Sequence, residues 1–127
     1  MRVLVCGGRS FNNAGLLIST LDRLHLDRKF SLVIHGAAKG ADTLAGDWAQ
    51  HRGLDVVCYP AKWGLLGKNA GKIRNQQMLD EAAPELVVAF RGGNGTMHMT
   101  SIAHKAGVEI IRVGWDLHSI NREASCK

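Results

Sequence analysis

The sequence predicts a single α/β domain in which helices flank a doubly wound, parallel, five-stranded sheet. Five short apolar runs rich in β-branched residues recur along the chain, and segments with helical spacing separate them. Most of the runs are continuously apolar rather than alternating, which is typical of strands buried on both faces. A chain of 127 residues fits one compact domain. We place this domain at residues 1–114 and a polar C-terminal tail at residues 115–127.

The expected strands share a high content of Val, Ile and Leu. They are Val3–Cys6, Leu32–His35, Asp55–Tyr59, Leu86–Phe90 and Glu109–Val113. A segment containing glycine or proline follows each of the first four, as is common where a strand ends.

Four helices are expected between these strands. They are Asn13–Leu26, Ala41–Arg52, Ala70–Ala83 and Thr96–Ala106. In the first, Leu17, Leu21 and Leu24 fall on one stripe, and Gly107 is a natural stop for the last. Because strand–helix–strand crossovers are right-handed, every strand-to-helix loop is expected at the same edge of the sheet.

The composition is that of an ordinary globular protein. The three cysteines, Cys6, Cys58 and Cys126, form no CxxC pair, which favours free thiols in a reducing compartment. No run approaches the roughly 18 apolar residues of a membrane span, and the N-terminus lacks the apolar core of a signal peptide. We therefore expect a cytoplasmic protein with no membrane partner. The net charge of +5 is compatible with an anionic partner.

The loops at the carboxyl edge of the predicted sheet are rich in glycine and in basic residues. They span residues 7–11, 36–42, 60–75 and 91–96. Their basic residues are Arg9, Lys39, Lys62, Lys68, Lys72, Arg74 and Arg91. Glycines allow backbone N–H groups to converge on an anion, and helix N-termini add partial positive charge. The loops therefore predict a phosphate-containing ligand, although ordinary tight turns with solvated lysines are the alternative.

Four side chains at this edge have two interpretations each. Thr96 is expected to cap the last helix and is also able to meet a phosphate. Asp42 caps the second helix or contacts a ribose hydroxyl. Arg74, four residues before Met78 on one helical face, pairs with a ligand phosphate or with an internal carboxylate. Trp63 stacks on a base or covers the edge of the core.

Several other kinds of site are disfavoured. The six histidines show no zinc spacing, so we expect no metal. No GxSxG nucleophile motif occurs. The first glycine loop lacks the GxGxxG order of dinucleotide-dependent dehydrogenases, and no cofactor is expected.

Four motifs of this chain resemble the YspA-type, cpYpsA-related branch of the SLOG superfamily. They are CGGRSF, IHGAAKGADTLAGDWA, YPAKWGLLGKNAGKIRNQQML and VVAFRGGNGTMHM. The resemblance extends from Met1 to about Val113. Relatives in the superfamily include the lonely guy phosphoribohydrolases, the core of DNA-processing protein A, and sensor domains for cyclic ADP-ribose derivatives. The resemblance implies a Rossmann-like sheet, a pocket for a nucleotide or nucleotide derivative, and a homo-oligomer.

The lonely guy hydrolases combine an arginine in an RKxxM stretch with a glutamate in PGGxGTxxE. Here RNQQM keeps Arg74 but has Asn75 in place of the lysine. RGGNGTMHM keeps the glycines but has Arg91 for the proline and Met99 for the glutamate. Because methionine cannot transfer a proton, the resemblance implies binding without the family's hydrolase chemistry. Asp42 is the best-placed substitute carboxylate, so Arg74 and Asp42 are the candidate catalytic residues.

The sequence thus favours a sensor or sequestering protein for a nucleotide or an ADP-ribose-like small molecule. An N-glycosidase acting on a nucleoside monophosphate is the alternative, and binding of single-stranded nucleic acid ranks third because aromatic residues are scarce. The candidate ligand-binding residues are Gly7, Gly8, Arg9, Ser10, Phe11, Gly36, Ala37, Gly40, Asp42, Trp63, Lys68, Arg74, Asn75, Met78, Arg91, Gly92, Gly93, Asn94, Gly95 and Thr96.

Overall fold

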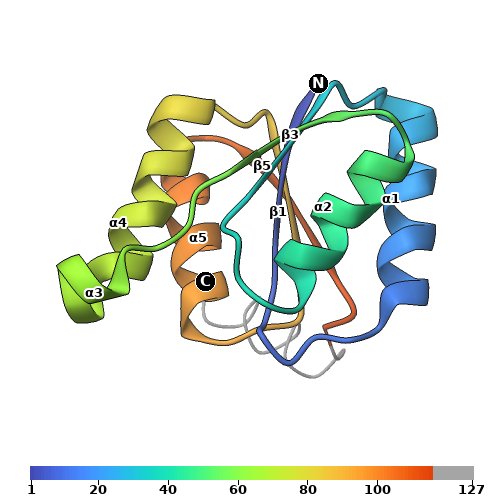
Figure 1. The fold of residues 1–127 in the computed structure, drawn as a ribbon. Helices are drawn as coiled ribbons and strands as arrows, with labels where there is room; N and C mark the ends of the chain where they lie inside the picture. The colour runs from blue at the N-terminus through green and yellow to red at the C-terminus, as the bar shows by residue number, and fades with distance from the viewer. Residues whose placement is uncertain (116–127) are drawn as a thin grey trace.

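A computed structural model of the chain describes residues 1–115 and contains a five-stranded parallel sheet with helices on both faces (Figure 1). The strands are β1 (Arg2–Cys6), β2 (Leu32–His35), β3 (Asp55–Cys58), β4 (Leu86–Phe90) and β5 (Glu109–Val113). Their order in the sheet is β3-β2-β1-β4-β5, and all pairs are parallel. The predicted doubly wound α/β fold is therefore confirmed. The predicted tail at 115–127 lies almost wholly outside the described residues.

Each of the four predicted helices is present, but the residues at which they begin and end differ from the predicted ones. They are α1 (Ala14–Arg28), α2 (Ala41–His51), α3 (Trp63–Leu66), the 3-10 turn η1 (Gly67–Asn69), α4 (Ala70–Gln77), the π-helical η2 (Met78–Ala82) and α5 (Asn94–Lys105). The predicted helix Ala70–Ala83 is thus α4 with a π-helical last turn. The long loop predicted after β3 contains a short helix, α3, which sequence reasoning missed.

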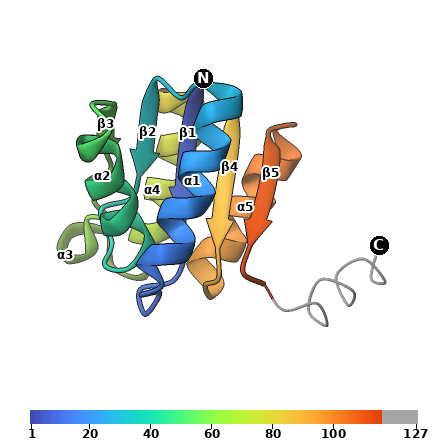
Figure 2. The same cartoon turned by 90° about the vertical axis from the view of Figure 1, so that its right-hand side faces the viewer.

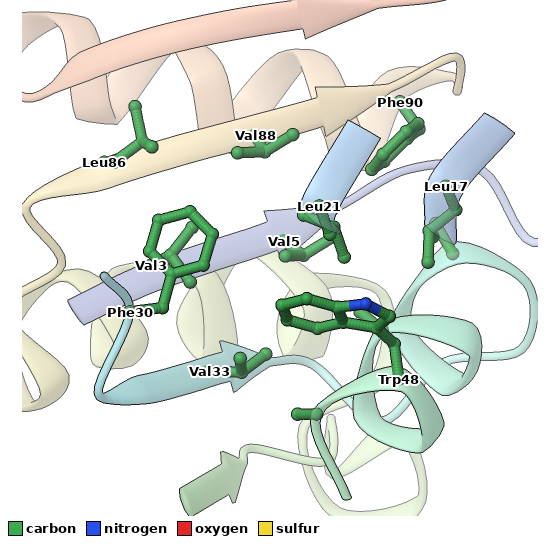
Figure 3. Close-up of a cluster of buried hydrophobic side chains, with 13 residues drawn as sticks. Val3, Val5, Leu17, Leu21, Phe30, Val33, Trp48, Leu86, Val88 and Phe90 are labelled. Atoms are coloured by element: carbon green, nitrogen blue, oxygen red, sulfur yellow. The ribbon is translucent and has the colours of Figure 1, made fainter. Parts of the chain in front are cut away.

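Helices α1 and α2 cover one face of the sheet, whereas α4 and α5 cover the other (Figures 1 and 2). The strands alternate their side chains between two apolar cores. Val3 and Val5 of β1 pack with Leu21 and Trp48 on the α1–α2 side, as Figure 3 shows. Leu4, between the two valines, packs on the opposite side. Because both sets are apolar, the strand reads as one continuous apolar run.

The chain changes faces between β3 and β4, and this reverses the direction in which strands are added to the sheet. β1 consequently has β2 on one side and β4 on the other. The loops after β1, β2 and β4 all meet at the lower end of the sheet in Figure 1. In doubly wound sheets this reversal point is where a crevice opens at the carboxyl ends of the strands. None of the helices within residues 1–115 is long and apolar enough to cross a membrane.

Candidate functional site

A pocket of about 340 Å³ opens at the carboxyl edge of the sheet, next to the ends of β1 and β4. Four connections contribute to it: the loops after β1, β2 and β4, and the α3–α4 segment. The lining residues are Cys6, Gly7, Gly8, Arg9, Ala38, Asp42, Trp63, Gly71, Arg74, Asn75, Gly93, Asn94, Gly95, Thr96 and Met99. The volume lies at the lower end of the range for small-molecule sites.

The N-terminus of α5 forms one wall of this pocket. Gly93 is the N-cap, no side chain caps the helix, and no acidic residue occurs in the first turn. The first intrahelical bond is donated by the Met97 N–H to the Gly93 carbonyl (3.0 Å). The N–H groups of residues 94–96 therefore have no intrahelical acceptor. The expectation that Thr96 caps the helix is wrong, because α5 begins two residues earlier and Thr96 lies inside its first turn, buried.

The loops after β1 and β4 touch each other through glycines. The Gly8 N–H donates to the Arg91 carbonyl (2.9 Å). A Cβ added at Gly92 would overlap Thr96 Oγ1 and would lie 2.6 Å from the Gly8 nitrogen. By contrast, a Cβ at Gly95 would meet nothing within 4 Å. Some of the predicted glycines are therefore required for loop packing, whereas others leave the pocket wall without side chains.

Asp42 and Arg74, which both line the pocket, also both contact the backbone of Gly36. Asp42 Oδ2 accepts hydrogen bonds from the N–H groups of Gly36 (3.1 Å) and Ala38 (3.2 Å). The Arg74 guanidinium donates to the carbonyl of Gly36 and also to that of Tyr59 (3.4 Å). Within residues 1–115, Arg74 forms no ion pair with an internal carboxylate, which was the predicted alternative, and its contacts here are to backbone oxygens.

The surroundings of Asp42 change its acidity. The N-cap of α2 is Gly40, so Asp42 does not cap the helix and instead holds the loop that precedes it. Burial raises the pKa of the Asp42 carboxyl to about 6, although the Ala38 and Gly36 N–H groups and the charges of Arg74 and Arg9 oppose the increase. Burial likewise lowers the pKa of the Arg74 guanidinium, against the attraction of Asp42.

Arg9 and Trp63 meet at the mouth of the pocket. The Arg9 guanidinium lies 5.4 Å from the centroid of the Trp63 ring, within the range of a cation–π contact. The Trp63 side chain is about half exposed and belongs to neither core cluster. Its ring also lies against Gly71, where an added Cβ would be 3.2 Å from it. Trp63 therefore does not cover the core edge, and part of its surface is open.

Asn75 joins the two helices that border the pocket. Its side-chain amide nitrogen donates to the Gly95 carbonyl (3.2 Å) and lies 3.1 Å from His98 Nδ1. Its Oδ1 accepts from Arg74 Nε (3.0 Å). The buried Asn75 thus fixes α4 against the first turn of α5 and orients Arg74.

The structure brings together eleven of the predicted ligand residues in this pocket and places the others around it. Ser10, Phe11, Arg91 and Gly92 line an adjoining depression. Gly36, Ala37 and Gly40 lie in the β2–α2 loop without lining the pocket, and Lys68 in η1 is also outside it. Met78 packs into the core.

Sequence reasoning did not place Cys6, Ala38, Gly71 and Met99 in the ligand site, yet all four line the pocket. Cys6 directly precedes the first glycine pair, so its place at the strand end was a usable signal. Met99 is buried one turn beyond Thr96, in the position where the hydrolases carry glutamate. No local signal indicates Ala38 or Gly71, because their place depends on how α3 and α4 return to the sheet.

The glycine contacts predict opposite effects on stability at two positions three residues apart. Gly92→Ala is expected to lower the free energy of unfolding by about 1–3 kcal/mol, because the added methyl group must displace Thr96 and the Gly8 backbone. Gly95→Ala, the matched control in the open first turn of α5, is expected to raise it by about 0.5–1 kcal/mol. Urea unfolding of both variants measures this, and equal destabilisation would contradict the assigned packing.

The acidity of Asp42 predicts a pH-dependent difference between the natural protein and Asp42→Asn. The folded-state pKa of about 6 exceeds the ordinary value of 3.8, so the folded protein binds more protons than the unfolded chain between these values. Ionised Asp42 therefore lowers the stability of the natural protein as the pH rises from about 4 to about 6.

Asparagine keeps an oxygen for the Gly36 and Ala38 N–H groups without the buried charge. We expect Asp42→Asn to be more stable than the natural protein by about 1–3 kcal/mol at pH 7, and the difference to vanish near pH 4. Urea unfolding at several pH values checks this. A difference that does not vary with pH would contradict it.

Comparison with known proteins places this architecture in a family. Residues 1–65, which include β1, α1, β2, α2 and β3, match the YspA, cpYpsA-related SLOG family. The Gene 61 protein of Mycobacterium phage D29 is 36% identical over 121 residues, covering 89% of this chain and 96% of that protein. The resemblance inferred from the motifs is therefore confirmed, and the chain belongs to the YspA, cpYpsA-related SLOG family.

Proposed function

We propose that the protein binds a nucleotide or an ADP-ribose-like nucleotide derivative in this pocket and acts as a sensor or sequestering protein. Membership of the SLOG family suggests binding or processing of a nucleotide-related ligand. The observation that carries the proposal is electrostatic. Arg9, Arg74 and the uncapped N-terminus of α5 converge on a pocket in which Asp42 is the single carboxylate among the residues that the structure describes. An anionic ligand balances this excess of positive charge.

The phosphate group fits best at the first turn of α5. The N–H groups of residues 94–96 are available there, and Gly93 and Gly95 have no side chain to obstruct a close approach. A helix terminus contributes about 0.3–1 kcal/mol per charge, and up to about 2 when partly buried. A hydrogen bond to a charged group adds about 1.5–3 kcal/mol. A few such contacts supply most of the roughly 8 kcal/mol that micromolar binding requires.

The remaining parts of a nucleotide have matching groups nearby. Asp42 is an acceptor for a ribose hydroxyl, because its carboxylate lines the pocket and would repel a phosphate. The open surface of the Trp63 ring is a stacking platform for a base, a role in which aromatic side chains contribute about 1–3 kcal/mol. Arg9, which already lies over that ring, would bring its charge close to the base and to the phosphate.

The pocket favours binding over hydrolysis because of Met99. This side chain is 1% exposed and lines the pocket without any group that can transfer a proton. One observation supports the N-glycosidase as a second candidate: the Asp42 carboxyl is in the pocket and has a pKa of about 6, close to the value suited to acid–base catalysis at neutral pH.

Binding is tested by calorimetry and by thermal unfolding with a panel of nucleotides, ADP-ribose and cyclic ADP-ribose isomers. At a concentration one hundred times its Kd, a ligand raises the free energy of unfolding by about 2.7 kcal/mol. Arg9→Gln should weaken binding at least tenfold. Arg23→Gln, which removes the same charge from the exposed face of α1, should leave the affinity unchanged. If no member of the panel stabilises the protein, the proposal fails.

Hydrolysis is tested by incubating the protein with nucleoside monophosphates and separating the free base by chromatography. We expect no release of base. Release that is lost in Asp42→Asn, while the variant still binds the nucleotide, would establish the N-glycosidase in place of the binding protein.

A further inference from the structure

The side-chain amide of Asn75 has a partner for its oxygen and for both hydrogens of its nitrogen. The oxygen accepts from Arg74 Nε (3.0 Å). The nitrogen donates to the Gly95 carbonyl (3.2 Å) and lies 3.1 Å from His98 Nδ1. An amide turned over would bring its nitrogen against the Arg74 N–H and its oxygen against the Gly95 carbonyl. Because Asn75 is buried, solvent would not relieve these mismatches, so Arg74 and Gly95 determine which way the amide faces.

This orientation of the Asn75 amide determines the proton state of His98. The Asn75 nitrogen presents a hydrogen to His98 Nδ1, so Nδ1 has to be the acceptor and the neutral ring carries its proton on Nε2. A protonated ring donates from both nitrogens, and its Nδ1–H would then face the Asn75 N–H. Protonated His98 is therefore incompatible with this contact to Asn75.

The surroundings of His98 favour the neutral ring. Partial burial lowers the pKa of His98 below its ordinary value of 6.5, and the charges of Lys72 on α4 and Lys105 on α5 lower it further. Arg74, beyond the Asn75 amide, is another cation. His98 is therefore neutral near pH 7 and gains its second proton only in more acidic solution.

Within residues 1–115, no carboxylate on the elements packed against α5 raises the pKa of this imidazole. The strand β4 contains no titratable residue. In β5, Glu109 is paired with Arg28 of α1 (2.6 Å), and Arg112 is a further cation. Asp80 of η2 lies near the C-terminal end of α5, where it lines a depression together with Lys105. The neutral ring is thus the state that the whole environment supports.

We propose that His98 is a positioning residue of the pocket: its neutral imidazole, acting through Asn75, holds the Arg74 guanidinium in the orientation that a ligand meets, and protonation of the imidazole releases it. His98 does not line the pocket itself. Once Asn75 is displaced, Arg74 retains only its contacts with the carbonyls of Gly36 and Tyr59. The role of Arg74 as a ligand contact rests on the proposed function, whereas the chain of hydrogen bonds needs no ligand.

The first test is made without a ligand. Two-dimensional proton–nitrogen NMR follows the Arg74 Nε–H signal and the Asn75 side-chain amide signals from about pH 8 to about pH 5. We expect them to shift together, with the same midpoint as the His98 ring and below pH 6.5. The measurement is made in the Asp42→Asn protein, because Asp42 itself titrates near pH 6 beside Arg74.

Two substitutions of His98 separate its roles as an acceptor and as a titrating group. Asparagine carries an oxygen near the place of Nδ1 and does not titrate, so His98→Asn should keep the Arg74 signal at its neutral-pH position throughout. Leucine offers no acceptor, so His98→Leu should displace this signal at every pH. His104→Leu, on the exposed surface of α5, is the matched control and should leave the titration unchanged.

The second test measures affinity for AMP, ADP-ribose and the other members of the nucleotide panel by calorimetry at about pH 8, where His98 is neutral. His98→Leu should weaken binding by about three- to tenfold, because Arg74 loses the contact that orients it. His98→Asn should bind within about twofold of the natural protein, because the acceptor for Asn75 is restored.

The two tests separate this inference from the proposed function. An Arg74 signal that does not follow the titration of His98, or that titrates equally in His98→Asn, overturns the inference. Equal affinities of the natural protein and His98→Leu also overturn it, because His98 would then have no effect on ligand recognition. If no member of the panel binds, the proposed function fails, whereas the NMR titration still decides whether His98 positions Arg74.

Discussion

The parallel pairing of β1 with β4 is the constraint on which the candidate site depends. Cys6 of β1 lies opposite Ala89 of β4, so the two strands end at nearly the same level. The loops that follow them therefore begin side by side, close enough for the Gly8 N–H to reach the Arg91 carbonyl. A shift of one residue in this register would turn the two core faces of β1 over and separate the loops. The apolar cores on both sides of the sheet thus determine the geometry of a polar site.

This close approach explains why glycine dominates the edge. At Gly8 and Gly92 an added Cβ would press on the backbone of the facing loop, so these residues serve packing first. At Gly93 and Gly95 an added Cβ would meet no protein atom within 4 Å. The absence of a side chain at these two positions instead leaves space for a ligand in the pocket. A glycine-rich motif in this fold therefore combines two separate physical requirements. The phosphate interpretation of the loops depends mainly on the second of them.

A glycine also holds the two opposite charges of the pocket, Asp42 and Arg74, in place. Buried opposite charges commonly pair directly. Here Asp42 and Arg74 share the backbone of Gly36, whose N–H donates to Asp42 and whose carbonyl accepts from Arg74. A Cβ at Gly36 would overlap the guanidinium, so only glycine permits this arrangement. Since neither charge is neutralised by the other in contact, both remain able to interact with a ligand. This arrangement suits recognition of a polar, anionic molecule.

The amino-acid sequence by itself determined the strands, their parallel orientation and the edge at which the loops gather. These features follow from local apolar runs and from the handedness of crossovers, so neighbouring residues are sufficient to predict them. The tertiary structure decided the partners of the polar side chains. Arg74 could be expected near an anion, but its contacts with the Gly36 and Tyr59 carbonyls arise from segments distant in sequence. The tertiary structure also determined that α5 begins at Asn94 and that the short helix α3 forms. It likewise placed Ala38 and Gly71 in the pocket. The physical reason is that hydrogen bonds and close approaches depend on distances of tenths of an ångström between elements, which no local pattern of residues encodes.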